Sequence, residues 1–198
     1  MGAPAESIEG CRFSHAALLS SIEGLTDEEA RSPCRLPGWT RGHVLTHLAR
    51  NADSVVRHLG GAARGVVLNQ YPGGMKGRAE AIEAGAARPA ADLIADVRSS
   101  AARVERAFAD LPERAWDNLV RSSRGVEYPA SFVAFARWRE VEVHHLDLGL
   151  GRVASDWPGP MVTRWLELEL ADLGDRAGPG ALLAWIIGRG PAPEIGPW

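Results

Sequence analysis

The sequence predicts an all-α protein, a four-helix bundle followed by a short C-terminal appendage that is α or α/β. Four long segments repeat apolar residues every three or four positions, which is typical of amphipathic helices packed in a bundle. Alternation of apolar and polar residues is scarce before residue 150, so no strand is expected there. The chain should therefore divide into a bundle over residues 1–150 and an abbreviated tail region over residues 151–198.

Glycine and proline, 22 and 13 residues of 198, gather between these segments and mark their ends. The first helix is expected over residues 5–25. The second follows Thr40, a suitable N-cap, and should stop near residue 59, before Gly60-Gly61. The third follows Pro89, and the fourth begins near Pro129, since proline fits the first turn of a helix.

The connection between the second and third helices is too long for a hairpin. It therefore predicts a crossover, with a short helix over residues 78–86. In the tail region we expect a helix over residues 160–173, followed by an apolar run over residues 182–188. Periodicity leaves open whether that run is a helix or a buried strand.

The composition excludes several classes of protein. The 25 acidic and 22 basic side chains are mixed, without the basic patch of a nucleic-acid-binding protein. No apolar run approaches the ~18 residues of a membrane span, and no signal peptide is visible. Cys11 and Cys34 lack metal-like or redox-like spacing, which favours a reducing compartment. We expect a cytoplasmic monomer or homodimer that binds neither nucleic acid nor membrane.

The fourth predicted helix carries polar residues in an unexpected place. At 100° per residue its apolar sector comprises Phe132, Val133, Phe135, Ala136, Val143 and Leu146. Glu140, His144 and Asp147 project into this sector or onto its border, whereas Arg137, Glu142 and His145 lie outside it. Unpaired buried charges are costly, so Glu140 and His144, one turn apart, need partners. They could hold one metal ion; the alternatives are a chance spacing or an ion pair with an arginine.

The second predicted helix offers a third ligand. His47 lies near its apolar stripe, where a lone histidine is usually an ordinary residue at the edge of the core. Opposite Glu140 and His144, it would complete a set of two histidines and one carboxylate, which leaves coordination positions open as in catalytic sites. Zinc is the expected metal, although iron, nickel and manganese also suit these donors.

Three other polar residues of these helices are assigned lesser roles. Asp147 is a candidate for orienting an imidazole of the site. His43 and His145 are expected to face solvent or to make ordinary hydrogen bonds.

Six short segments are more informative as a set, in their order and spacing, than any one of them alone. They are residues 36–53 (LPGWTRGHVLTHLARNAD), residues 71–74 (YPGG), Arg78 with residues 82–86 (IEAGA), Arg88-Pro89, residues 139–149 (REVEVHHLDLG) and residues 156–158 (DWP). Together they resemble the mycothiol-dependent maleylpyruvate isomerases, a family of DinB-like metal-binding helical bundles. The resemblance covers most of residues 30–160. It implies that His47, Glu140 and His144 hold a metal, usually zinc, and that Trp39 is architectural.

The resemblance also implies a thiol cosubstrate, mycothiol, and a small-molecule substrate. Residues 183–189 (LAWIIGR) resemble a family segment whose arginine matters for activity, so Arg189 is a candidate for binding substrate or thiol. Arg78 is a second candidate for binding a carboxylate of the ligand. A surface or ion-pair role is the alternative for each. The tail region is shorter than the α/β domain of the family.

Three functions remain open at this point. The first is cis–trans isomerisation of maleylpyruvate or a related cis-enedioate by thiolate addition, rotation and elimination. The second is mycothiol S-transfer to an electrophile, in detoxification or natural-product biosynthesis. The third is a metal-binding bundle without turnover. The intact set of three ligands favours an enzyme.

Overall fold

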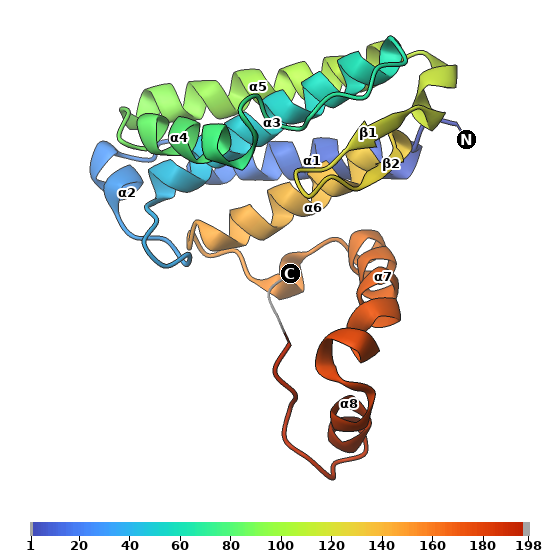
Figure 1. The fold of residues 1–198 in the computed structure, drawn as a ribbon. Helices are drawn as coiled ribbons and strands as arrows, with labels where there is room; N and C mark the ends of the chain where they lie inside the picture. The colour runs from blue at the N-terminus through green and yellow to red at the C-terminus, as the bar shows by residue number, and fades with distance from the viewer. Residues whose placement is uncertain (1, 196–198) are drawn as a thin grey trace. The chain divides into compact units, whose positions relative to one another are not determined.

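The computed structural model describes residues 2–195, and its contacts divide the chain into two compact units, one up to Asp156 and one from Trp157. In the first unit four long helices lie side by side (Figure 1): α1 (Ala5–Ile22), α3 (Arg41–Ala63), α5 (Ala90–Asp110) and α6 (Ser131–Asp147). α3 packs against α5 and α6, and α1 packs against the same two helices. The predicted four-helix bundle is therefore confirmed.

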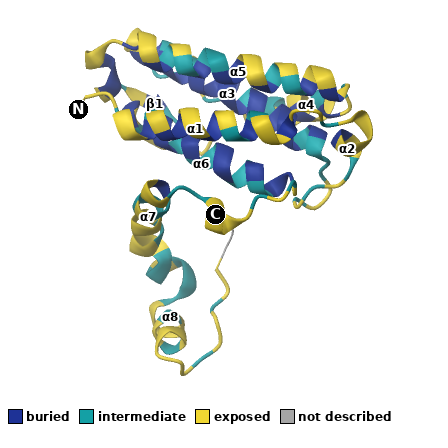
Figure 2. Cartoon of the chain, turned by 180° about the vertical axis from the view of Figure 1, so that it is seen from behind, coloured by how far each residue is buried: buried dark blue, intermediate teal, exposed yellow. Residues whose placement is uncertain are grey.

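Apolar side chains from all four helices fill the centre of this bundle. The core cluster includes Leu18 and Ile22 of α1, Leu45 and Leu48 of α3, Leu93 and Val97 of α5, and Val141 of α6. Each such side chain contributes about 1.5–3 kcal/mol by leaving water. In Figure 2 the α1 ribbon alternates between buried and exposed residues, as expected for a helix with one face on the core.

The long crossover between α3 and α5 is confirmed and contains a helix, α4 (Gly74–Ala86), packed on α3. α4 begins four residues earlier than expected (residue 74 against 78). A further short helix, α2 (Asp27–Arg31), follows α1, which ends at Ile22 rather than at residue 25. Thr26 caps α2, and its side chain exchanges hydrogen bonds with Glu29 in a capping box.

The expectation that α3 stops before Gly60-Gly61 is wrong. α3 continues to Ala63, and a Cβ at Gly61 would lie 2.6 Å from the Val66 carbonyl oxygen. Gly61 therefore serves a close approach of the following loop. The turn comes at Gly65, whose φ of +67° favours glycine.

The expectation of no strands before residue 150 is also wrong. After the 3-10 helix η1 (Glu113–Asp117), strands β1 (Leu119–Arg121) and β2 (Glu127–Pro129) form an antiparallel hairpin with Val120 opposite Tyr128. Three-residue strands are too short to produce a recognisable alternation in the sequence. The hairpin leads directly into α6.

In the second unit, which follows the 3-10 helix η2 (Ala154–Asp156), the structure describes two helices, α7 (Gly159–Ala177) and α8 (Pro179–Ile186). The apolar run near residue 185 is thus a helix rather than a strand. Within this unit the rings of Trp157 and Trp165 lie 6.1 Å apart, and Trp165 donates to Glu169. Among the described residues, no helix is long and apolar enough to cross a membrane.

Candidate metal centre

Helices α3 and α6 bring together the three predicted ligands. The Nε2 atom of His47 lies 2.7 Å from Glu140 Oε1 and 3.0 Å from His144 Nε2, and His144 Nε2 lies 3.6 Å from Glu140 Oε1. One residue comes from α3, and the other two are one turn apart on α6. The three donor atoms therefore converge on one point.

This donor set fits a divalent metal ion such as zinc. Bonds of about 2.0–2.1 Å to a tetrahedral zinc place two ligand atoms about 3.3 Å apart. The three separations of 2.7, 3.0 and 3.6 Å scatter around that value. Within the described residues, this trio is the group of histidine, cysteine and carboxylate side chains whose atoms lie close enough to hold an ion. Three protein ligands leave further coordination positions for a substrate or a thiol.

Burial and mutual contact shift the pKa values of all three side chains. Burial lowers the pKa of His47 to about 4, although Glu140 acts in the opposite direction. Burial alone would raise the pKa of Glu140, but hydrogen bonds from His144 and His47 hold it well below its ordinary value. Burial alone would lower the pKa of His144, but hydrogen bonds to Asp147 and Glu140 raise it to about 9. These contacts favour a proton on His144, which a metal ion binding at this point would have to displace.

Asp147 holds the ring of His144 in place. Its Oδ2 atom accepts a hydrogen bond from His144 Nδ1 at 2.9 Å, which directs the opposite nitrogen, Nε2, toward His47 and Glu140. A carboxylate behind a metal-binding histidine fixes the tautomer and orientation of the ring. Asp147 therefore lies where the sequence argument expected an orienting group.

Two side chains contact His47, one from the crossover and one from the turn that precedes α3. Arg78 of α4 donates from Nη2 to His47 Nδ1 at 3.1 Å, and its guanidinium lies 5.8 Å from the ring centre of Tyr71. The ring of Trp39 meets His47 edge-on with centroids 6.0 Å apart. Trp39 is architectural in that it packs on His47, a candidate ligand. The sequence argument did not predict this contact, because Trp39 lies before the start of α3.

The start of α3 is fixed close to these side chains. Thr40 caps the helix, with its Oγ1 accepting from the His43 backbone and its own N–H donating to His43 Nδ1 at 3.1 Å. The Nε2 atom of His43 lies 3.3 Å from Glu83. His43 thus makes ordinary hydrogen bonds, as expected. Arg41 donates to the Leu148 carbonyl at 2.8 Å, which ties the start of α3 to the end of α6.

The expected apolar sector of α6 is only partly right. Val133 and Phe135 are buried as expected, whereas Phe132, Ala136, Val143 and Leu146 are only partly buried. Arg137, Glu142 and His145, which were expected outside the sector, are 1%, 1% and 2% exposed. The inward stripe of α6 runs instead through Ala134, Trp138, Val141, His145 and Leu148. Glu140 and His144 lie at the edge of this stripe, where they meet α3.

The buried polar residues of α6 misled the sequence argument because each has a partner in the fold. Arg137 donates to Asn51 Oδ1 and to His15 Nε2, and Arg152 donates twice to Glu142. His145 is hydrogen-bonded to Ser21 at 2.8 Å. A polarity scale counts such residues as exposed, although hydrogen-bonded polar groups can be buried.

Arg189 follows α8 in the second unit. It is exposed, and its Nη1 atom donates to the Gly188 carbonyl at 3.2 Å. The structure brings together His47, Glu140, His144 and Arg78 within the first unit, and Arg189 belongs to the second unit. Its role stays a prediction.

The fold and the trio define the class of this protein. It is a helical bundle with a site of two histidines and one carboxylate between facing helices. The model of the mycothiol maleylpyruvate isomerase N-terminal domain matches residues 11–149, and the chain belongs to this family. Its structure is similar to a crystal structure of the mycothiol-dependent maleylpyruvate isomerase, with 28% identity and a TM-score of 0.78. The match covers 82% of this chain and 67% of the other.

A crystal structure of a variant of that enzyme, with one histidine replaced by alanine, is similar to the same extent. It shows 27% identity and a TM-score of 0.77 over the same shares of both chains. No curated protein matches the sequence. Family and neighbours together support an enzyme of the mycothiol-dependent, maleylpyruvate isomerase-like kind.

Proposed function

We propose that this chain is a metal-dependent enzyme that uses mycothiol to isomerise maleylpyruvate or a related cis-enedioate. The observation that carries the proposal is the convergence of His47, Glu140 and His144 within the family's own N-terminal domain. A divalent metal at this point, most simply zinc, would favour the thiolate form of a bound thiol, which is the nucleophilic form.

The reaction needs only the reversible addition of the thiol to the substrate. The sulfur adds to one carbon of the cis double bond, and the electron pair of that bond moves onto the conjugated carbonyl. The resulting single bond rotates, the electron pair returns, and the thiolate leaves with the trans double bond formed. Atoms balance because the thiol is regenerated. The substrate and product therefore have the same mass.

Arg78 is suited to bind a carboxylate of the substrate. Among the described residues no carboxylate is paired with it, and its partner is the neutral Nδ1 atom of His47. A neutral imidazole that binds a metal through Nε2 carries its hydrogen on Nδ1. Arg78 then has no acceptor there, and its guanidinium is available for a carboxylate, with which it pairs strongly. We further propose that Arg189 binds substrate or thiol, as the resemblance implies.

The proposal is tested by supplying the zinc-loaded chain with mycothiol and maleylpyruvate and following the product by mass and chromatography. A product of unchanged mass that forms only with mycothiol is expected. Addition of the thiol mass would favour S-transfer. No reaction with maleylpyruvate or with a panel of electrophiles would favour a non-catalytic bundle.

Arg78 has its own test in the same assay. Arg78→Gln should raise KM for the substrate about tenfold or more, since a charge-assisted pair is lost, while the bound zinc stays the same. Exposed Arg106→Gln serves as the matched control. An unchanged KM in Arg78→Gln would contradict the assignment.

A further inference from the structure

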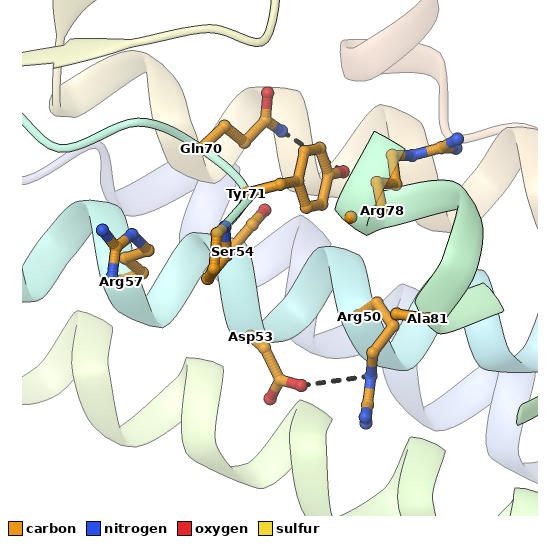
Figure 3. Close-up of a pocket in the computed structure, with 10 residues that line it drawn as sticks. Arg50, Asp53, Ser54, Arg57, Gln70, Tyr71, Arg78 and Ala81 are labelled. Atoms are coloured by element: carbon orange, nitrogen blue, oxygen red, sulfur yellow. Dashed lines mark hydrogen bonds and ion pairs between the residues drawn. The ribbon is translucent and has the colours of Figure 1, made fainter. Parts of the chain in front are cut away.

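A pocket lies beside the candidate metal centre, between α3, α4 and the loop that joins them (Figure 3). Its volume is about 400 Å³, within the range of small-molecule sites. α3 contributes Arg50, Asp53, Ser54 and Arg57, and the loop and α4 contribute Gln70, Tyr71, Pro72, Gly77, Arg78 and Ala81. The three ligands of the metal centre are not among the lining residues, so this is a separate cavity.

Two arginines of the pocket have no acidic partner in the part of the chain that the structure describes. Arg57 donates from Nε to the Asn69 carbonyl at 2.9 Å, and Arg78 donates to the ring of His47. Both acceptors are neutral, and no carboxylate of the described residues pairs with either guanidinium. In contrast, Arg50 contacts both Asp53 and Asp96. Asp53 is in turn engaged by Arg103 at 2.6 Å, so the acidic residue of the pocket is already used.

Tyr71 provides a wall and a further donor between these arginines. It is 8% exposed, and in Figure 3 its ring lies between Arg57 and Arg78. Its hydroxyl oxygen accepts from Gln70 at 3.5 Å, which leaves the hydroxyl hydrogen free to donate. The free polar groups of the pocket are therefore donors, whereas Pro72, Ala81 and the Tyr71 ring offer apolar contact.

We propose that this pocket binds a small organic anion, whose carboxylate or phosphate group pairs with Arg57 and whose apolar body rests on the Tyr71 ring. Guanidinium groups bind both kinds of oxyanion by charge-assisted hydrogen bonds. The site goes beyond the proposed isomerase reaction, because its main donor, Arg57, lies two helical turns from Arg50 and nearly three from His47 along α3. It shares only Arg78 with the metal centre.

The test uses the full chain treated with EDTA, so that no carboxylate can bind through a metal. Benzoate and phenyl phosphate are titrated by calorimetry and by saturation-transfer NMR, with benzamide as the neutral match to benzoate. Binding of at least one anion, with benzamide at least tenfold weaker, is expected. A preference between benzoate and phenyl phosphate identifies the acid group. No binding of either anion would overturn the proposal.

Variants locate the bound anion. Arg57→Gln should weaken binding about tenfold or more, whereas Arg64→Gln, an exposed arginine at the end of α3 that does not line the pocket, should leave it unchanged. Equal affinities of wild type and Arg57→Gln would overturn the assignment. Zinc content and turnover are measured separately, so failure of the pocket is distinguishable from failure of the proposed reaction.

Discussion

Arg137 of α6 donates from Nη1 to the main-chain carbonyl of Leu48 on α3 at 2.9 Å, one residue after the candidate ligand His47. The same atom donates to Asn51 Oδ1 at 2.8 Å, and Arg137 Nε donates to His15 Nε2 at 3.2 Å. His15 is in turn 3.2 Å from Glu105. This buried chain joins α1, α3, α5 and α6 beside the candidate metal centre and holds the two ligand-bearing helices together.

Replacing Arg137 should therefore affect both stability and metal binding. Arg137→Met leaves Asn51 and His15 without their buried donor, and a loss of about 2–4 kcal/mol in the free energy of unfolding is expected. Zinc affinity should fall as the α3–α6 register loosens. Urea unfolding without metal and zinc competition measure the two effects, with exposed Arg106→Met as control. If Arg137→Met has the wild-type stability and the wild-type zinc affinity, this hydrogen-bond network is dispensable.

The assignment of the metal ligands is tested by His47→Ala. This variant should lose most of its bound zinc, because two remaining ligands hold the ion poorly. His43→Ala removes a histidine one turn earlier on α3 that is outside the trio, and it should retain zinc. Metal content after dialysis is the measurement. Near-stoichiometric zinc in His47→Ala would refute the site.

Asp147→Asn tests the support behind His144. The variant keeps the shape of the side chain but weakens the hydrogen bond that fixes the His144 ring, so zinc affinity should fall about 10–100-fold. Asp110→Asn, exposed at the end of α5, is the matched control. A competition titration with a chromogenic chelator gives both affinities. If the two variants bind zinc equally well, Asp147 has no orienting role.

The buried carboxylate of Glu142 depends on Arg152. The Glu142 side chain is 1% exposed, and Arg152 reaches its Oε2 from Nη2 at 2.6 Å. Arg152→Met should cost about 3–5 kcal/mol, because it leaves a buried charge without its cation. The double variant with Glu142→Gln should recover part of this loss in urea unfolding. The exposed pair of Arg12 and Glu9 provides the control, since Arg12→Met should cost under about 1 kcal/mol.

Stability of the metal-free chain should fall as the pH decreases below about 6.5. Burial lowers the pKa of His15, His47, His58 and His145, to about 4 for His47 and His145. Below the ordinary histidine pKa of about 6.5, the unfolded chain binds protons that the folded chain does not, so the free energy of unfolding decreases. For His145 this loss extends from about pH 6.5 to its folded pKa of about 4.

The measurement is the urea midpoint between pH 7 and pH 5 in the presence of EDTA. His145→Gln should show a shallower decline than the wild type, because one of the histidines with a lowered pKa no longer titrates. The comparison is between slopes, so a uniform loss of stability in the variant does not affect it. An identical slope would contradict a role for His145.

Local sequence signals predicted the bundle and most helix positions. The Thr40 cap, the proline before α5 and the spacing of apolar residues act within one or two turns of the chain, so they can be read without the fold. The three candidate ligands were also named from the sequence, because Glu140 and His144 share a helix face and His47 lies near the apolar stripe of the second predicted helix. The resemblance then implied the same three residues. The two short strands and the true end of α3 could not be predicted in this way, because they depend on contacts with other segments of the chain.

The sequence by itself determined the helices and nominated His47, Glu140 and His144. Only the tertiary structure decided which face of α6 is inside, since Arg137, Glu142 and His145 are buried against partners from α1, α3 and the segment after α6. It also brought Arg78 to His47 and left Arg57 without a counter-charge among residues 2–195. The physical reason is that helix propensity is local, whereas the cost of burying a charge depends on partners that are distant in sequence.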